Sequence, residues 1–193
     1  MTFKSGLLGL AFAMGSTAAS AATLNFQANL SGDQEVPSVV TSVTGFASLS
    51  LNTVAETLSV VLSVNGLNIG GLFDTLVAAP VGPIHLHNAP AGVNGPIVVP
   101  FPFGATYIDT DTGFDLIAND ISYASAAALA GSSLSFSDFV GELQSGGIYF
   151  NVHSDFNTSG EIRGQVSAVP IPASIFLLFA GLGGMAMVRA RRA

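Results

Sequence analysis

The chain has 193 residues, no cysteine and a formal net charge of −7. All 12 acidic residues lie between residues 23 and 168, where Arg163 is the only lysine or arginine, so this body has a formal charge of −11. Such a surface repels nucleic acid and anionic lipid, and a chain without cysteine forms neither disulfides nor thiolate metal sites. Nucleic acid is therefore excluded as a partner.

The first 22 residues have the pattern of a secretory signal peptide. Lys4 precedes an apolar run over residues 6–15, and small residues follow that run. The run is too short to span a bilayer by itself. Ala19 and Ala21 are the small residues that signal peptidase would recognise, so we expect cleavage after Ala21 or Ala22 and export of the remaining chain.

Residues 23–168 are predicted to form one all-β domain. Apolar and polar residues alternate with a period of two in short segments separated by Gly, Pro and Asn, a pattern typical of a sandwich or barrel. The predicted strands cover residues 24–30, 45–51, 57–65, 83–87, 96–101, 147–153 and 161–166. One short helix is expected over residues 137–144 with Ser137 as its cap, and residues 105–134 are expected to hold an extra hairpin or a long loop.

Three segments of this body resemble the CHRD domain, which is named for the vertebrate chordin proteins and also occurs in exported bacterial proteins. They are LSGDQEVP at residues 30–37, IHLHNAPAG at residues 84–92 with NGPIV after it, and YFNVHS at residues 149–154 followed by GEIRGQ at 160–165. The resemblance implies an extracellular, immunoglobulin-like antiparallel β-sandwich. It implies no established catalytic activity.

The polar residues of two predicted strand segments are expected to share one face. His85 and His87 alternate with Ile84 and Leu86, and Tyr149, Asn151 and His153 alternate with Phe150 and Val152. If the last two strands form a hairpin, one register pairs Tyr149 with Gln165, Asn151 with Arg163 and His153 with Glu161.

Two interpretations of this face stay open. In the first, the face binds zinc or copper, for which three histidines and a carboxylate are a workable ligand set. These residues are His85, His87, His153 and Glu161. Alternatively, Tyr149, Asn151, His153, Glu161 and Arg163 form a hydrogen-bonded cluster that fixes the strand register, with no cofactor. The sequence favours the structural cluster, because three histidines in two segments are common without a metal.

No nucleophile motif stands out in the sequence. There is no Gly-x-Ser-x-Gly elbow, no Ser-x-x-Lys, no phosphate-binding glycine loop and no cysteine. The body also has one arginine and no lysine. We therefore expect a protein that is not an enzyme.

The last 25 residues have the features of a surface-sorting signal. Val169, Pro170, Ile171, Pro172 and Ala173 form a proline motif, residues 173–188 form an uncharged span, and a cluster of three arginines follows, Arg189, Arg191 and Arg192. This segment resembles the PEP-CTERM class, closest to its Val-Pro-Leu-Pro-Ala variant. The resemblance implies a precursor held transiently in the inner membrane of a Gram-negative-type bacterium and cleaved by an exosortase-type peptidase.

Together these features predict three segments: a signal peptide (1–22), a CHRD-like domain (23–168) and a sorting signal (169–193). The predicted function is that of a non-enzymatic secreted or cell-surface protein of the extracellular matrix. Its expected partners are signal peptidase, the exosortase-type peptidase, and extracellular polysaccharide or surface proteins. Two alternatives are a metal-binding protein or metalloenzyme that uses His85, His87 and His153, and a permanently membrane-anchored adhesin.

Overall fold

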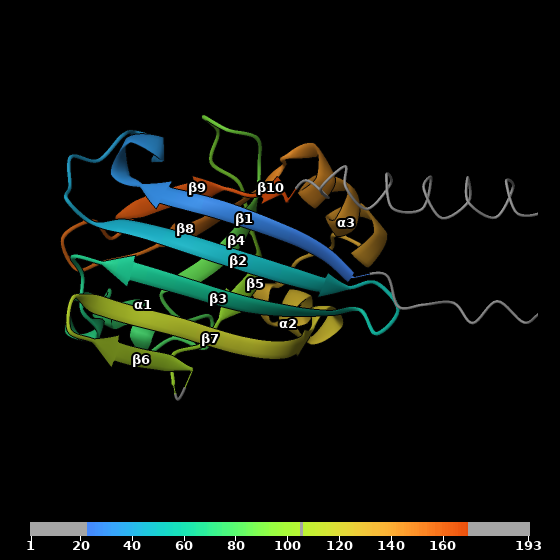
Figure 1. Ribbon diagram of the computed structural model, residues 1–193, viewed down its shortest axis with the longest axis horizontal. Coiled ribbons are helices and arrows are strands. Elements are labelled where there is room, and N and C mark those ends of the chain that lie inside the picture. Colours follow the sequence, from blue (N-terminus) through green and yellow to red (C-terminus); the bar gives the residue numbers. More distant parts are fainter. Residues whose placement is uncertain (1–22, 105, 170–193) are drawn as a thin grey trace, which may run out of the picture.

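The computed structural model describes residues 23–104 and 106–169, which are predominantly antiparallel β structure (Figure 1). The strands are β1 (Thr23–Ser31), β2 (Thr44–Asn52), β3 (Thr57–Asn65), β4 (Ile84–Asn88), β5 (Ile97–Phe101), β6 (Tyr107–Thr110), β7 (Gly113–Ser122), β8 (Ile148–Val152), β9 (Ile162–Gln165) and β10 (Ser167–Ala168). The helices are α1 (Asp74–Val77), α2 (Tyr123–Ala130) and α3 (Phe136–Ser145). The all-β prediction is confirmed.

The strands follow one hydrogen-bonded path in the order β5-β4-β8-β9-β1-β2-β3-β7-β6, and β10 pairs with β1. Figure 1 shows β1, β2, β3, β7 and β6 in front, with β9, β8, β4 and β5 behind them. The two layers join where β1 meets β9 through the pair of Ser31 with Arg163. One sheet therefore turns back on itself around the core.

The predicted immunoglobulin-like sandwich, which has two separate sheets, differs from this arrangement. The reason lies at β1, which pairs with β2 along its whole length and with β9 and β10 on its other side. Hydrogen bonds therefore continue from one layer to the other. Alternation of side chains predicts which face of a strand is buried but does not predict which strand edges pair.

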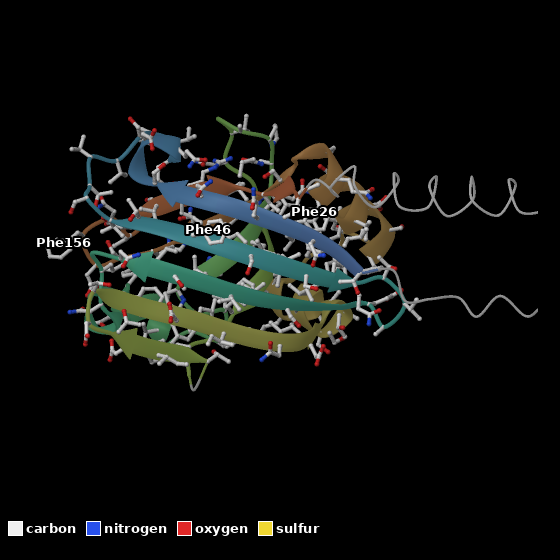
Figure 2. The ribbon with its side chains drawn as sticks, viewed as in Figure 1. Phe26, Phe46 and Phe156 are labelled. Atoms are coloured by element: carbon white, nitrogen blue, oxygen red, sulfur yellow. The ribbon has the colours of Figure 1, made fainter. Side chains whose placement is uncertain are left out.

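Alternate residues of both layers fill the core. In the front layer these include Ala47, Leu49, Leu58 and Leu62, and in the rear layer Ile84, Leu86, Phe150, Val152 and Ile162. Figure 2 labels Phe26, which is 2% exposed, and Phe46, which is 47% exposed. Burial of these apolar side chains is the main stabilising term for a fold without disulfides.

The segment 105–134 contains both an expected and an unexpected element. The hairpin of β6 and β7 agrees with the expected extra hairpin. The following helix α2 was not predicted, because its sequence YASAAALA shows no helical alternation of apolar and polar residues. Its signal is the high intrinsic helix propensity of alanine.

The predicted helix near residues 137–144 is confirmed as α3, but its cap lies two residues earlier than predicted. Oγ of Ser135 accepts a hydrogen bond from the Asp138 backbone N–H at 3.1 Å. Phe139 and Leu143, one turn apart, are fully buried. The helix ends at Gly146, whose φ of 78° suits a residue without a Cβ atom.

We expect Ser135→Ala to lower the free energy of unfolding by about 1 kcal/mol, because the first turn of α3 loses its cap. Ser137→Ala is the matched control, since Ser137 contacts the Ser135 hydroxyl but is not the cap. Urea denaturation of both variants measures the difference. Equal losses in the two variants would contradict the assignment of the cap.

Both predicted end segments lie outside the described residues. At the N-terminus this applies to the signal peptide with Ala19, Ala21 and Ala22. At the C-terminus it applies to residues 170–173 of the sorting motif, the span 173–188 and the terminal arginines. Within the described residues, no helix is long and apolar enough to cross a membrane.

Candidate functional site

Three neighbouring strands, β4, β8 and β9, carry polar side chains on the face that points away from the core. The register places His85 opposite Asn151 and Asn151 opposite Arg163, and in the next row His87 opposite Tyr149 and Tyr149 opposite Gln165. The hairpin register predicted for β8 and β9 is therefore confirmed at both pairs. We call this surface the polar face; its members are His85, His87, Tyr149, Asn151, His153, Arg163 and Gln165.

Loops cover the polar face, so it is buried rather than open to solvent. In the loop before β5, the Gly95 backbone N–H donates to the Tyr149 hydroxyl at 3.2 Å, and the Gly95 carbonyl accepts from Nδ1 of His87 at 2.9 Å. In the loop after β8, the Thr158 carbonyl accepts from Nδ1 of His153 at 2.9 Å. As a result His85, His87 and His153 are only 1%, 9% and 8% exposed.

Arg163 holds the first of these loops against the sheet. Its Nη1 donates to the Val93 carbonyl at 2.9 Å and its Nη2 donates to the Pro90 carbonyl at 3.0 Å. Its guanidinium lies 3.5 Å from the centre of the Tyr149 ring, and that ring stacks on His87. Burial lowers the pKa of Arg163, while the charges of Tyr149 and Glu35 oppose the shift.

The three histidines of the chain converge at the β4 side of the polar face. One possible ligand nitrogen from each of His85, His87 and His153 lies within 4.8 Å of the other two. Nδ1 of His85 and Nε2 of His153 are 3.2 Å apart. β4 supplies the first two side chains at alternate positions, and the residue directly after β8 supplies the third.

Burial keeps all three imidazoles in the neutral form. It lowers the pKa of His85 to about 3, helped by the neighbouring His153, and lowers the pKa of His87 to about 4. The carbonyl contacts of Gly82 with His85 and of Gly95 with His87 act in the opposite direction. Burial also lowers the pKa of His153, although its hydrogen bond to the Thr158 carbonyl acts to raise that pKa. Neutral imidazole is the form that binds metal ions.

Comparison with known proteins places this face within a family domain. A model of the CHRD domain matches residues 26–166. The chain belongs to the CHRD domain family. No curated protein and no solved structure matches the chain. The CHRD domain thus includes the whole polar face, whereas the predicted sorting signal lies outside the matched residues and stays a prediction.

Glu161 of the CHRD domain lies in a separate network and is not part of the histidine group. Its Oε1 accepts from the Thr41 hydroxyl at 2.5 Å, and its Oε2 accepts from the Ser154 hydroxyl at 2.6 Å and the Asn157 amide at 2.5 Å. Burial raises the pKa of this carboxyl, but the three hydrogen bonds outweigh burial and the pKa is lowered. Glu161 therefore holds the loops around residues 41 and 154–157 in place.

Glu35, in the family-like segment at residues 30–37, was not expected near the polar face, because nothing in the sequence brings it there. It is 6% exposed, and burial raises its pKa to about 7; the charge of Arg163 lowers the pKa and that of Glu161 raises it. Among the described residues, neither its Oε1 nor Oδ1 of Asn151 has a hydrogen-bond partner. A Cβ atom on Gly160 would meet both oxygens, so glycine is required there for them to approach.

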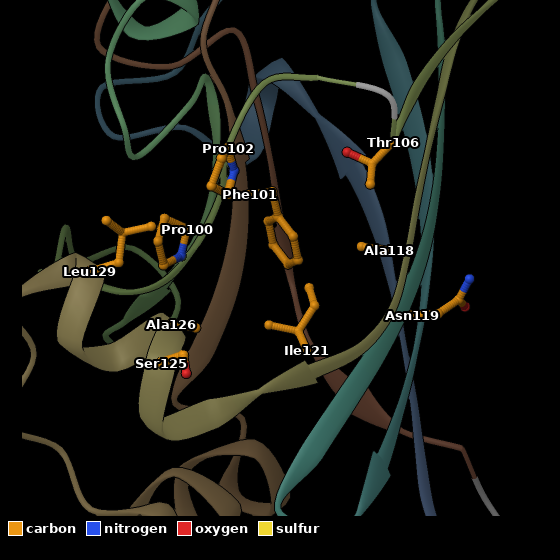
Figure 3. Close-up of a pocket in the computed structure, with 10 residues that line it drawn as sticks. All are labelled: Pro100, Phe101, Pro102, Thr106, Ala118, Asn119, Ile121, Ser125, Ala126 and Leu129. Atoms are coloured by element: carbon orange, nitrogen blue, oxygen red, sulfur yellow. The ribbon is translucent and has the colours of Figure 1, made fainter.

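An apolar pocket of about 360 Å³ lies elsewhere in the CHRD domain, between β5, β7 and α2 (Figure 3). Figure 3 shows the Phe101 and Ile121 side chains projecting into the space between the sheet and the helix. None of the residues that line it belongs to the polar face. The pocket is therefore separate from the histidine cluster.

Proposed function

We propose that this CHRD protein is an exported, non-enzymatic binding module of the cell surface or extracellular matrix, processed at its C-terminus by an exosortase-type peptidase. The observation that carries the non-enzymatic part is the burial of the polar face. Its histidines and Arg163 are at most 9% exposed, so a substrate cannot reach them without displacement of the covering loops. A catalytic centre needs access to its reacting atoms.

The charge of the body supports a role outside the cell. Arg163 is the only lysine or arginine of the body. Its guanidinium donates hydrogen bonds to loop carbonyls and lies over the Tyr149 ring. The exposed charges are therefore almost all carboxylates, which keep the domain soluble and attract cations. Anionic polymers are poor partners for such a surface, so neutral polysaccharide or surface proteins are the partners that we propose.

The tail motif supports the sorting route. Pro170 and Pro172 lack the backbone N–H groups that a helix interior uses, so the sequence predicts an extended segment ahead of the uncharged span. An extended, accessible segment next to a membrane span is what a membrane peptidase can cleave. The arginines after the span favour its cytoplasmic end.

Cell fractionation in the protein's own host tests the sorting route. We expect the wild-type chain outside the cell, shortened at both ends, and a Pro170→Ala, Pro172→Ala double variant retained at full length in the membrane fraction. Ser174→Ala, just after the motif, is the control and should be processed like the wild type. Wild-type protein that stays in the membrane with its tail intact would contradict the proposal and indicate an anchored adhesin.

A further inference from the structure

We propose that His85, His87 and His153 together bind one transition-metal ion of the zinc or copper kind, inside the CHRD domain and beneath its covering loops. This site goes beyond the proposed export and binding function. The first argument is distance. Two imidazole nitrogens that share one ion at about 2.0–2.1 Å lie roughly 3.3 Å apart in tetrahedral geometry. The 3.2 Å between Nδ1 of His85 and Nε2 of His153 matches this value.

The second argument is the orientation of the rings. A backbone carbonyl only accepts hydrogen bonds, so Nδ1 carries the proton in His87, which faces the Gly95 carbonyl, and in His153, which faces the Thr158 carbonyl. Nε2 of each ring then carries the lone pair. A histidine ligand in a metal site has this arrangement, with one nitrogen held by a carbonyl and the other directed at the ion.

The third argument is a lone pair without a partner. Within residues 23–104 and 106–169, Nε2 of His87 is buried and has no hydrogen-bond partner. A buried polar atom left unpaired costs free energy, and native proteins rarely leave one in that state. Protonation would not remove the deficit, because burial disfavours the charged ring. An ion that accepts the lone pair of His87 does remove it.

The donor set decides the class of ion. Three imidazole nitrogens suit zinc, copper, nickel or iron, whereas calcium and magnesium require oxygen ligands. Among the described residues no carboxylate belongs to the group, and Glu161 is hydrogen-bonded to Thr41, Ser154 and Asn157 instead. The charge of Arg163 acts on His87 and weakens the attraction of a divalent ion. Copper binds nitrogen donors most strongly among these metals, and zinc is commonly held by imidazoles in tetrahedral sites, so these two ions fit best.

The ion would fasten the loops that close the domain. His87 is hydrogen-bonded to the loop at Gly95 and His153 to the loop at Thr158, while both rings would share one ion. Two loops and two strands would then be joined at a single point. In a chain without cysteine such an ion would take the structural role that disulfides have in other exported domains.

The test uses full-length protein purified with its covering loops intact, stripped with a chelator, and titrated separately with Zn²⁺ and with Cu²⁺. We expect one ion per chain and a higher melting temperature in the presence of the ion. His87→Gln should weaken binding by more than about 100-fold, since the loss of outer hydrogen bonds alone costs 10–100-fold in known sites. Glutamine can still donate to the Gly95 carbonyl, which favours correct folding of the variant.

Asp109→Asn is the control for non-specific binding by the acidic surface and should leave affinity unchanged, since Asp109 is exposed and lies outside the histidine group.

If His87→Gln fails to fold, Co²⁺ binding to the wild type decides between the outcomes. Intense visible absorption from nitrogen ligation supports the site, and its absence overturns it. Equal affinity of the wild type and His87→Gln would also overturn it. Neither result depends on where the chain is processed, so failure of this site is distinguishable from failure of the sorting proposal.

Discussion

Arg163→Met is expected to lower the free energy of unfolding by about 3 kcal/mol. Arg163 donates to two loop carbonyls, and a hydrogen bond that involves a charged group contributes about 1.5–3 kcal/mol. Here we expect the lower end of that range, because Pro90 and Val93 are exposed residues whose carbonyls can turn to water once the loop is released. The remaining loss comes from the Tyr149 contact and from the half-buried Gln165 side chain, which also accepts from Arg163.

Arg163→Lys separates charge from geometry. Lysine keeps the positive charge but lacks the planar fork that reaches acceptors in two directions and lies flat on an aromatic ring. We expect an intermediate loss of stability, and faster proteolysis of the loop at residues 90–94 in both variants. Urea denaturation and limited proteolysis measure these effects. A loss below 1 kcal/mol in Arg163→Met would show that the loop is held by other contacts.

Acidification of the metal-free protein is expected to destabilise it by at least about 1.4 kcal/mol per pH unit between pH 6 and pH 5. Unfolded histidines take up protons near pH 6.5, whereas folded His85 and His87 resist protonation down to about pH 3 and pH 4, and the pKa of His153 is also lowered. Their contribution to stability is therefore complete above pH 6.5 and decreases as the pH falls. His85 and His87 each contribute about 1.4 kcal/mol per pH unit.

Glu35 acts in the opposite sense. Its pKa is raised to about 7 in the folded protein from 4.5, so its contribution is present below pH 4.5 and is lost as the pH rises toward 7. The neighbouring charges of Arg163 and Glu161 set the size of this shift together with burial. His85 and His87 against Glu35 leave a net uptake of about one proton on unfolding, which corresponds to about 1.4 kcal/mol per pH unit, and His153 adds to this slope in the same direction.

Two variants test the sign of each contribution. His87→Gln should reduce the slope of stability against pH by about 1.4 kcal/mol per unit, and Glu35→Gln should increase it by the same amount. Urea denaturation at pH 7, 6 and 5, with chelator present, measures the slopes. Equal stability of the wild-type protein at pH 7 and pH 5 would contradict the assigned burial of the histidines.

Alternation along the strands was enough to predict that the histidines share one face. The register of β8 with β9 needed a further assumption, that the two strands form a hairpin in which polar residues such as Asn151 and Arg163 pair. The pairing of β1 with both β9 and β10 could not be predicted in the same way. Edge pairing depends on the path of the whole sheet.

The covering of the polar face by loops could not be predicted from the sequence, for a different reason. It depends on loop carbonyls at residues 90, 93, 95 and 158, and every residue type has a carbonyl, so the sequence contains no signal for them. Glu35 likewise reaches the face through the turn at Gly32–Gln34, far from it in sequence. Glu161 was expected near His153 by register, but its hydroxyl and amide partners direct both of its oxygens elsewhere.

The native mass of the protein released by its own host tests the account most directly. We predict a chain that begins at Ala22 or Thr23 and ends between Val169 and Ala173, with one metal ion retained under non-denaturing conditions. A mass that includes the signal peptide or the terminal arginines would contradict the exported and processed module. A correctly processed chain without an ion after exposure to Zn²⁺ and Cu²⁺ would contradict the histidine site and leave the export route intact.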